Sequence, residues 1–503
     1  MAFSASVGNL RDQSNNGYVA VPLLITEGVA AISGVIPTEL VGFDIPRRLG
    51  AGWLKTNGVS EKPGSTAVLR STAGASVILV SVGKSFTDEE SWRLAGGATM
   101  RIVGTEAVSF LLPLDLISDP RGCAHALTEG AALAVYDYKM PEKESSLIVV
   151  PLGSPLPSPE AVGDIERAIE DALTTTELVN WAKRLIDMPP RDASPRKLAK
   201  AFAKRLEQAD NVTVEIWDED HVKEEGLGGL IGVGRGSNEP VRLVYATYRP
   251  KAGDSIPHVV LVGQGITFDS GGLSIKSAEG MMTMKADMSG SAIVMATLAA
   301  CAEMGINIRV TAIAPMTENM TGGSATRPGD VLTIRNGTTV EVLNTDDEGR
   351  LVLADGLTLA TEIEPSLIID IATLTGAQRV ALGDEIGAYY SNSDPVATSL
   401  ESASRATGEL LWRMPLHDGY NATLDSDVAD IKNIGSGGGG SITAALFLQR
   451  FVGGKPWVHL DIASTARTES GGGYLTRGAT AFGVRTLVHL LSEIASHGTV
   501  PSA

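Results

Sequence analysis

Cysteine is nearly absent from this chain, whose 503 residues include only Cys123 and Cys301. Neither belongs to a Cys-x-x-Cys pair, which excludes a disulfide framework and favours a reducing compartment. The segment from Met1 to Asn16 has no basic region followed by an apolar run, so we expect no secretory signal. The most apolar stretch, Ile293 to Cys301, is too short to span a bilayer. We therefore expect a cytoplasmic protein with no membrane partner.

Positive charge is also in short supply. The chain has 41 lysines and arginines against 59 aspartates and glutamates, a net charge of −18. This excess opposes binding to phosphate backbones, so we expect no nucleic-acid partner. With 43% hydrophobic residues and a mean hydropathy near zero, the composition is typical of a soluble globular protein. A chain of this length is expected to form two domains.

Several common catalytic signatures are missing. The seven histidines include no pair at metal-ligand spacing, so any metal site must be rich in carboxylates and suit a hard or borderline cation. There is no Gly-x-Ser-x-Gly elbow to support a serine hydrolase. A phosphate-binding loop before Lys84 would need glycine where the chain has Ile78, and the run 232–237 lacks the third glycine of a dinucleotide-binding fingerprint.

Apolar strand-like runs alternate with helical segments along most of the chain, which predicts an α/β fold. We expect a smaller N-terminal α/β domain at 1–160, a long linking helix at 161–190 and a larger C-terminal α/β domain at 191–503. The sheet of the larger domain should be mixed and mostly parallel. Representative predicted elements are strands Tyr18–Ile25, Ser76–Val82, Ser146–Pro151 and His258–Val262, and helices Asp88–Ala95, His125–Val135, Ser289–Met304 and Leu353–Glu362.

Two carboxylate-bearing segments stand out against this background. The apolar strand ending at Val262 leads through a glycine-studded turn to Asp269, and sites in open α/β sheets lie at the carboxyl ends of strands. Taken alone, Asp269 could equally be a capping residue. In the second segment, an alternating backbone would place Asp346 and Glu348 on one side, with Arg350 continuing the row and Asp347 opposite. This row fits a metal site with an anion pocket, although a solvated acidic turn is the simpler alternative.

The exact amino-acid sequences of these segments indicate a protein family more specifically than their acidic charge does. The runs GITFDSGG (265–272), KADMSG (285–290) and NTDDEGRLVLADGL (344–357), with Lys276 between the first two, resemble the leucyl aminopeptidase (cytosol aminopeptidase) family of two-metal peptidases. The resemblance extends from about Met188 to the C-terminus. It implies an aminopeptidase acting on peptides with apolar, leucine-like first residues, assembled as a homohexamer of two stacked trimers.

The resemblance also implies a role for each matched acidic residue. Asp269 and Glu348 would bridge two divalent cations, Mn²⁺ or Zn²⁺ and possibly Mg²⁺. Asp287 would bind one of the two ions and Asp346 the other.

Further positions match the catalytic and substrate-binding residues of the family. Lys276 would be the catalytic cation, and Arg350 would hold a bicarbonate-like anion beside the reacting water. Asp347 would be a solvated bystander. The pocket for the first side chain of the substrate would be lined by Met284, Thr373 and Gly376, with Leu374 making a backbone contact.

One position departs from the family pattern. The family has a metal-binding lysine where this chain has Gln264, whose carboxamide oxygen is at best a weak ligand. Loss of a neutral nitrogen ligand is expected to change metal preference, metal affinity or rate, on the order of 10–100-fold by analogy with changes in outer-shell partners. Two outcomes follow: an active aminopeptidase that favours Mn²⁺ or Mg²⁺, or a weakened homologue with an assembly or binding role.

Overall fold

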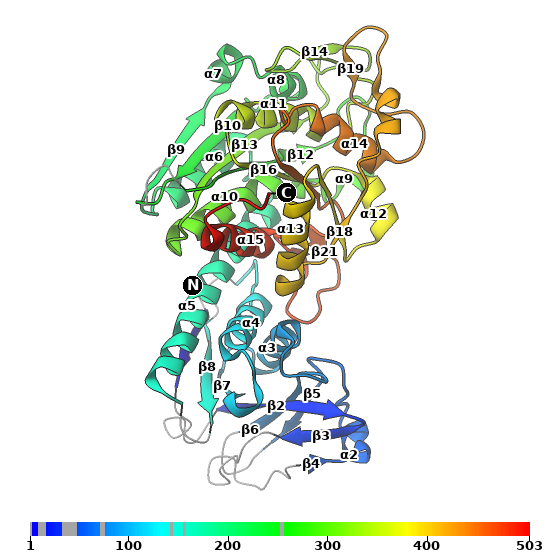
Figure 1. Ribbon diagram of the computed structural model, residues 1–503. Coiled ribbons are helices and arrows are strands. Elements are labelled where there is room, and N and C mark those ends of the chain that lie inside the picture. The colour runs from blue at the N-terminus through cyan, green and yellow to red at the C-terminus, as the bar shows by residue number, and fades with distance from the viewer. Residues whose placement is uncertain are drawn as a thin grey trace. The chain divides into compact units, whose positions relative to one another are not determined.

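The computed structural model describes residues 3–8, 17–32, 48–70, 76–140, 144–153, 157–251 and 256–502 (Figure 1). Most of the segment from Met1 to Asn16 thus lies outside the described residues. The chain divides into two compact units: Met1–Asn180 with Glu469–Arg477, and Trp181–Thr468 with Gly478–Ala503. Helix α5 (Pro159–Asp187) is 29 residues long and passes from the first unit into the second near Asn180.

The described part of the first unit is built on an eight-stranded sheet with the order β1-β8-β7-β2-β3-β4, to which β6 adds beside β2 and β5 beside β6. Its strands are β1 (Phe3–Val7), β2 (Tyr18–Thr26), β3 (Val29–Ile32), β4 (Arg48–Leu49), β5 (Thr66–Leu69), β6 (Ser76–Ser81), β7 (Ala107–Pro113) and β8 (Ser145–Leu152). Its helical segments are α2 (Ala51–Thr56), α3 (Glu89–Val103), η2 (Leu114–Leu116), α4 (Pro120–Ala134) and the first part of α5. The predicted strands are confirmed to within one or two residues.

Helix α3 is longer than predicted, since it continues through Gly96 and Gly97 to Val103. Glycines usually indicate the end of a helix, because a glycine loses more backbone entropy than other residues when the helix forms. Here they permit close helix packing: a Cβ on Gly96 would lie 2.2 Å from the carbonyl oxygen of Leu127 in α4. The entropic cost is offset by this approach of two buried helices.

The second unit contains a nine-stranded sheet with the order β18-β17-β20-β16-β11-β13-β10-β9, with β12 beside β13. Strands β11, β13, β16 and β20 run parallel at its centre, and antiparallel pairs lie toward both edges. The predicted mixed, mostly parallel sheet is confirmed. The strands of the sheet are β9 (Val212–Trp217), β10 (Arg242–Tyr248), β11 (His258–Gly263), β12 (Gly265–Asp269), β13 (Arg309–Asn319), β16 (Leu367–Ala372), β17 (Gly387–Ser391), β18 (Leu411–Arg413) and β20 (Trp457–Asp461).

Helices and short ribbons cover this sheet (Figure 1). The helical segments are α6 (Pro195–Leu206), α7 (Glu219–Glu224), α8 (Gly228–Gly234), α9 (Ala278–Met281), η3 (Met284–Ala286), α10 (Ser289–Glu303), α11 (Gly349–Glu362), α12 (Gly376–Leu382), α13 (Asp394–Thr407), η4 (Asp418–Leu424), α14 (Gly440–Gln449) and α15 (Val484–His497). The remaining strands are β14 (Val331–Thr333), β15 (Thr339–Glu341), β19 (Ile431–Lys432), β21 (Arg467–Thr468) and β22 (Gly478–Ala479).

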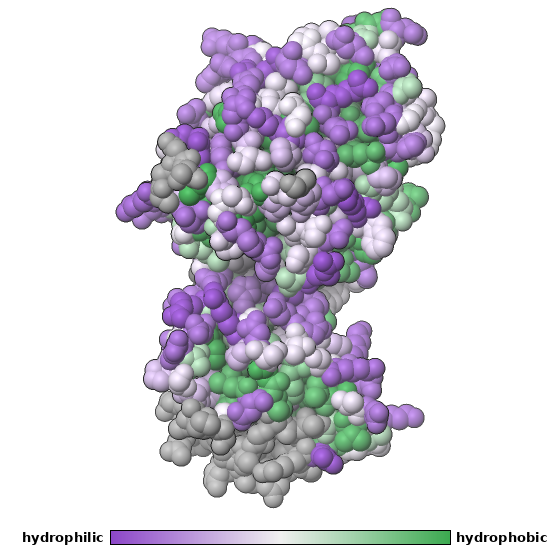
Figure 2. All heavy atoms as spheres, in the orientation of Figure 1, coloured by the Kyte–Doolittle hydropathy of each residue, from purple (hydrophilic) through white to green (hydrophobic). Residues whose placement is uncertain are grey.

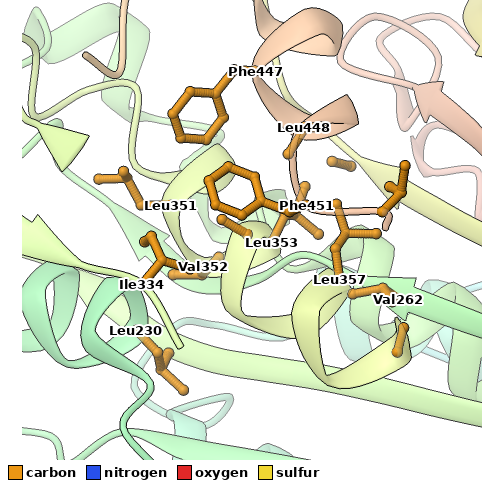
Figure 3. Packing of buried hydrophobic residues seen from close by; sticks show 14 of the residues in the cluster. Leu230, Val262, Ile334, Leu351, Val352, Leu353, Leu357, Phe447, Leu448 and Phe451 are labelled. Carbon is orange, nitrogen blue, oxygen red and sulfur yellow. The ribbon is translucent and has the colours of Figure 1, made fainter. Parts of the chain in front are cut away.

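Helix α11 is the buried support of the acidic segment. It begins at Gly349, four residues before the predicted start at Leu353, and nearly all of its residues are buried. Figure 3 shows Leu351 and Leu353 of α11 beside Phe447 of α14 and Phe451, which follows that helix, within one hydrophobic cluster. Close packing of this kind fixes the helix, so the residues at its N-terminus are held in place as well.

Hydrophobic residues are scattered in small groups over the face of this unit that Figure 2 shows, among predominantly hydrophilic ones. Among the described residues, no helix has the length and apolar character needed to cross a membrane.

Candidate active site

The candidate site lies at the carboxyl ends of the central parallel strands. Gln264 directly follows β11, Asp269 is the last residue of β12, Thr373 follows β16 and Asp461 ends β20. Strand β11 lies between β13 and β16, and the chain reaches these two neighbours on opposite sides of it. Such a switch point leaves an opening at the strand ends where ligands bind in open α/β sheets.

Three of the predicted site residues form one compact cluster, which we call the lysine side: Lys276, Asp269 and Asp346. The Nζ of Lys276 lies 2.7 Å from Oδ2 of Asp269 and 2.6 Å from Oδ1 of Asp346. Burial alone would lower the pKa of Lys276, but the surrounding carboxylates outweigh it and raise that pKa. The ammonium therefore stays charged and neutralises part of the acidic cluster.

Local backbone geometry brings Lys276 back to Asp269. Gly271 and Gly272 have φ values of 85° and 61°, which side-chain-bearing residues rarely adopt. A Cβ on Gly271 would also lie 2.5 Å from Oδ1 of Asp346. Asp269 itself is fixed because its Oδ1 accepts hydrogen bonds from Asn319 Nδ2 and the Gly271 N–H, each at 2.8 Å. The turn predicted between Val262 and Asp269 is largely strand β12, and the glycines that the site requires follow Asp269.

A second group, which we call the glutamine side, consists of Gln264, Asp287 and Glu348, all of them buried. Gln264 Nε2 donates to the backbone oxygen of Asp287 at 3.2 Å, and Thr373 Oγ1 donates to Asp287 Oδ1 at 2.5 Å. Burial and the negative charge of Asp269 raise the pKa of Asp287 and that of Glu348 well above their usual values. The Lys276 ammonium lowers both pKa values in part, but it pairs directly with Asp269 and Asp346 and not with these two carboxylates.

Three oxygens on the glutamine side have no hydrogen-bond partner among the described residues: Gln264 Oε1, Asp287 Oδ2 and Glu348 Oε2. Buried acceptors without partners are rare, because each leaves its desolvation cost uncompensated. Ligand oxygens of Glu348, Asp269 and Asp346 also lie within 4.8 Å of one another. An all-oxygen set of this kind fits divalent cations, which would satisfy these acceptors and balance the charge.

Arg350 does not continue the row of Asp346 and Glu348. The predicted alternation was wrong because helix α11 begins at Gly349, which places Arg350 in its first turn and three residues from Asp347. Arg350 Nη2 donates to Asp347 Oδ1, so Asp347 is an ion-pair partner and not a solvated bystander. The guanidinium is buried, and its Nη1 donates to the backbone oxygen of Asn433 at 2.5 Å.

The residues predicted to line the substrate pocket lie around the same strand ends. Met284 begins η3, three residues before Asp287, and Gly376 begins α12. Thr373 contacts the Asp287 carboxylate directly, as described above. The N–H of Leu374 is not free for a ligand, since it donates to Asp461 Oδ1 at 3.1 Å.

Asp461 is a residue that the sequence reasoning missed. It is fully buried and organises the segment after β16: besides the Leu374 N–H, its Oδ1 accepts from the Thr375 N–H at 3.3 Å and its Oδ2 accepts from Thr375 Oγ1 at 2.6 Å. Thr375 in turn caps α12 by accepting from the Gln378 N–H at 3.1 Å. The available signal was an aspartate that directly follows the short run 457–460, which is apolar except for His459.

Comparison with known proteins adds to this geometry. A model of the cytosol aminopeptidase family, catalytic domain, matches residues 180–488, and one of the N-terminal domain of that family matches residues 51–140. The chain belongs to the cytosol aminopeptidase family. The predicted resemblance is therefore confirmed, as is the two-domain α/β architecture, and the protein is a peptidase.

Individual members of this family match most of the chain. A probable cytosol aminopeptidase of Leifsonia xyli is 43% identical over 425 residues, covering 81% of this chain and 83% of the relative. One of a Geobacter species is 40% identical and covers 87% and 90%. Among solved structures, the bottromycin maturation enzyme BotP in complex with Mn superimposes with a TM-score of 0.82 at 34% identity, covering 95% of this chain and 99% of BotP.

Proposed function

We propose that this protein releases N-terminal amino acids from peptides with the help of two divalent cations. The observation that carries the proposal is the set of buried, unpartnered oxygens of Gln264, Asp287 and Glu348 next to the acidic cluster. Asp269 and Glu348 would be shared by both cations, and Asp346 would complete the lysine side. Membership of an aminopeptidase family supports the reaction class.

Bound at these residues, two cations would supply Lewis acidity and lower the pKa of a shared water. Because every donor on the glutamine side is an oxygen, we infer that Mn²⁺ or Mg²⁺ is preferred there over Zn²⁺. The complex of BotP with Mn is consistent with this preference. Gln264 would contribute its carboxamide oxygen, while its Nε2 stays bonded to the Asp287 backbone.

Lys276 would stabilise the negative charge that develops on the peptide carbonyl oxygen during attack. Its ammonium is already held at the site by Asp269 and Asp346, so little reorganisation is needed when the reaction begins. The Lys276 side chain is 17% exposed, so a substrate can reach part of its surface.

The first residue of the substrate would lie beside Met284, Thr373 and Gly376. A thioether, a threonine methyl group and a glycine offer a surface of medium size and apolar character, which favours leucine-like side chains. The hydroxyl of Thr373 is engaged by Asp287 and so does not present a polar group to that side chain.

Assembly and location form part of the same proposal. We expect a homohexamer of two stacked trimers, and light scattering coupled to size exclusion measures this directly. A cytoplasmic location fits the names of the relatives and the two free cysteines, Cys123 and Cys301, which are both buried. Burial raises the pKa of each thiol to about 12, so neither is a reactive thiolate.

The alternative is a weakened homologue that does not bind the second cation, because Gln264 replaces the lysine ligand of the family. An activity assay separates the active aminopeptidase from the weakened homologue. Hydrolysis of leucine p-nitroanilide is measured during a titration with Mn²⁺, and bound metal is quantified at each step. We expect turnover that rises with Mn²⁺ occupancy. Absence of turnover at full occupancy would leave only the binding role.

Lys276→Met provides the matched test of the reaction. Removal of one preorganised charge from a water-poor site costs on the order of 10²–10³ in kcat, and we expect that loss with Mn²⁺ still bound. Lys223→Met, on the exposed surface of α7, is the control and should retain activity. Equal kcat values for the two variants would remove Lys276 from the reaction.

A further inference from the structure

The surroundings of Arg350 do not fit a free anion. A bicarbonate-like ion binds arginine best through two parallel N–H donors. Here Nη1 donates to Asn433 and Nη2 donates to Asp347, and Nε is a buried donor with no hydrogen-bond partner in the described part of the chain. With its side chain only 3% exposed, Arg350 presents no open edge to an ion from solution.

The Asp347 carboxylate is held on both of its oxygens. Oδ1 accepts from Arg350, and Oδ2 accepts from Asn344 Nδ2 at 2.5 Å. Asn433 locks this arrangement, because its Nδ2 donates to the backbone oxygens of Asn344 and Asp347 at 2.7 and 3.3 Å. The carboxylate is thus a fixed part of the segment that also carries Asp346.

An ordinary helical ion pair has a different appearance. Asp164 and Arg167 in α5 have the same order and spacing, but both side chains are about half exposed. Pairs of that kind contribute little, since water competes for both groups. Asp347 and Arg350 are 17% and 3% exposed, and Asp347 lies in sequence between two expected metal ligands, Asp346 and Glu348.

We propose that the carboxylate of Asp347 is the resident anion of Arg350 and takes the place of a bicarbonate-like ion in this enzyme. A second anion at the same guanidinium would lie against the negative charge of Asp347, which already accepts from Nη2. Asp347 would therefore act as a positioning residue that balances Arg350 and orders the acidic segment. The inference rests on the proposed peptidase site, but its binding test does not require turnover.

Calorimetric titration of sodium bicarbonate into the Mn²⁺-loaded, full-length protein tests the proposal. The unaltered protein should give no saturable heat, whereas Asp347→Ala should bind one bicarbonate per chain in the space that the carboxylate leaves. Asp347→Asn, which keeps that space filled, should bind none. If Asp347→Ala does not fold, Asp347→Ser leaves comparable room and replaces it.

Leucine p-nitroanilide hydrolysis supplies the second readout. The unaltered protein should be equally active with and without bicarbonate. Asp347→Ala should lose about 10–100-fold in kcat, the usual cost of an outer-shell partner of a metal site, and recover part of it with bicarbonate. Asp164→Ala, the control, should behave as the unaltered protein. Saturable bicarbonate binding by the unaltered protein, or an Asp347→Ala variant that neither binds nor responds to bicarbonate, would overturn the proposal.

Discussion

The lysine side and the glutamine side of the site differ in how their buried carboxylates are neutralised. On the lysine side, Asp269 and Asp346 share the Lys276 ammonium, so the chain supplies its own cation. On the glutamine side, Asp287 and Glu348 face Gln264, a neutral residue whose free oxygen adds one more acceptor. Because burial makes carboxylates without an ion pair costly, we expect the glutamine side to depend on a bound ion more than the lysine side does.

This difference also separates what each side contributes. The lysine side carries an ammonium that two carboxylates hold in place, which suits a group that stabilises developing negative charge. The glutamine side has hard oxygen donors alone, which suits the holding of a cation. Substitutions on the two sides should therefore have different signatures in rate and in metal content.

The largest expected effect comes from Glu348→Gln. Glu348 belongs to the glutamine side and also lies in one carboxylate cluster with Asp269 and Asp346. The substitution removes its charge while keeping the shape of the side chain. We expect kcat/KM for leucine p-nitroanilide to fall on the order of 10³-fold and bound Mn²⁺ to fall below two ions per chain. Activity assays with metal quantification by mass spectrometry measure both.

Glu219→Gln provides the control for this substitution, because Glu219 pairs with Lys223 on the surface of α7. It should leave rate and metal content unchanged. If Glu348→Gln kept two bound ions and full activity, the glutamine side would not be a cation site.

The site residues that could be predicted from the sequence are placed by patterns in the neighbouring residues of the chain. The apolar run that ends at Val262 places the residues after it, up to Asp269, near the carboxyl edge of the sheet. The α/β class and the mixed, mostly parallel sheet follow from the same alternation of apolar segments. For Asp287 and Lys276, which follow no such strand, only the resemblance to the family indicated a role.

The residues that could not be predicted depend on contacts distant in sequence. Asp347 was expected to be solvated because the start of α11 was placed four residues too late, and its partner Asn344 is ordered by Asn433, 89 residues away. Asp461 binds the segment after β16 from another strand. Periodicity cannot reveal which buried polar groups meet across such separations.

A smaller effect is expected from Gln264 itself. Gln264→Leu removes the free carboxamide oxygen, so we expect Mn²⁺ affinity to fall about 10-fold. Gln264→Glu adds a carboxylate and should raise that affinity. The metal-free Gln264→Leu protein should unfold at nearly the same denaturant concentration, because the lost hydrogen bond to Asp287 is offset by removal of a buried, unpartnered acceptor.

Gln378 is the matched control, since it is fully buried with both ends of its amide satisfied. Its Nε2 donates to the Ile386 oxygen at 2.8 Å, and its Oε1 accepts from the Ser464 N–H at 3.1 Å. Gln378→Leu should therefore cost about 1–3 kcal/mol of unfolding free energy and leave Mn²⁺ affinity unchanged. The contrast fails if Gln264→Leu destabilises the metal-free protein as much as Gln378→Leu does.

The smallest expected effect lies at the opposite end of β11 and concerns stability alone. His258 is buried, bonds Thr311 Oγ1 at 2.9 Å, and has its pKa lowered to about 4 by burial and by Arg309 and Arg249. The unfolded chain therefore binds a proton between pH 6.5 and 4 that the folded chain does not, so the contribution is present above pH 6.5 and is lost as the pH falls toward 4.

Between pH 7 and pH 5 the metal-free protein should lose on the order of 1–2 kcal/mol of unfolding free energy from this residue. His258→Gln, which can keep the bond to Thr311, should reduce that loss, and denaturant unfolding at the two pH values measures the difference. The exposed His497→Gln serves as the control. Activity at pH 7 should be unaffected in both variants, because His258 lies at the amino end of β11 and Gln264 follows its carboxyl end. A His258→Gln protein with the acid sensitivity of the unaltered chain would show that the site's carboxylates, and not this end of the strand, dominate the loss.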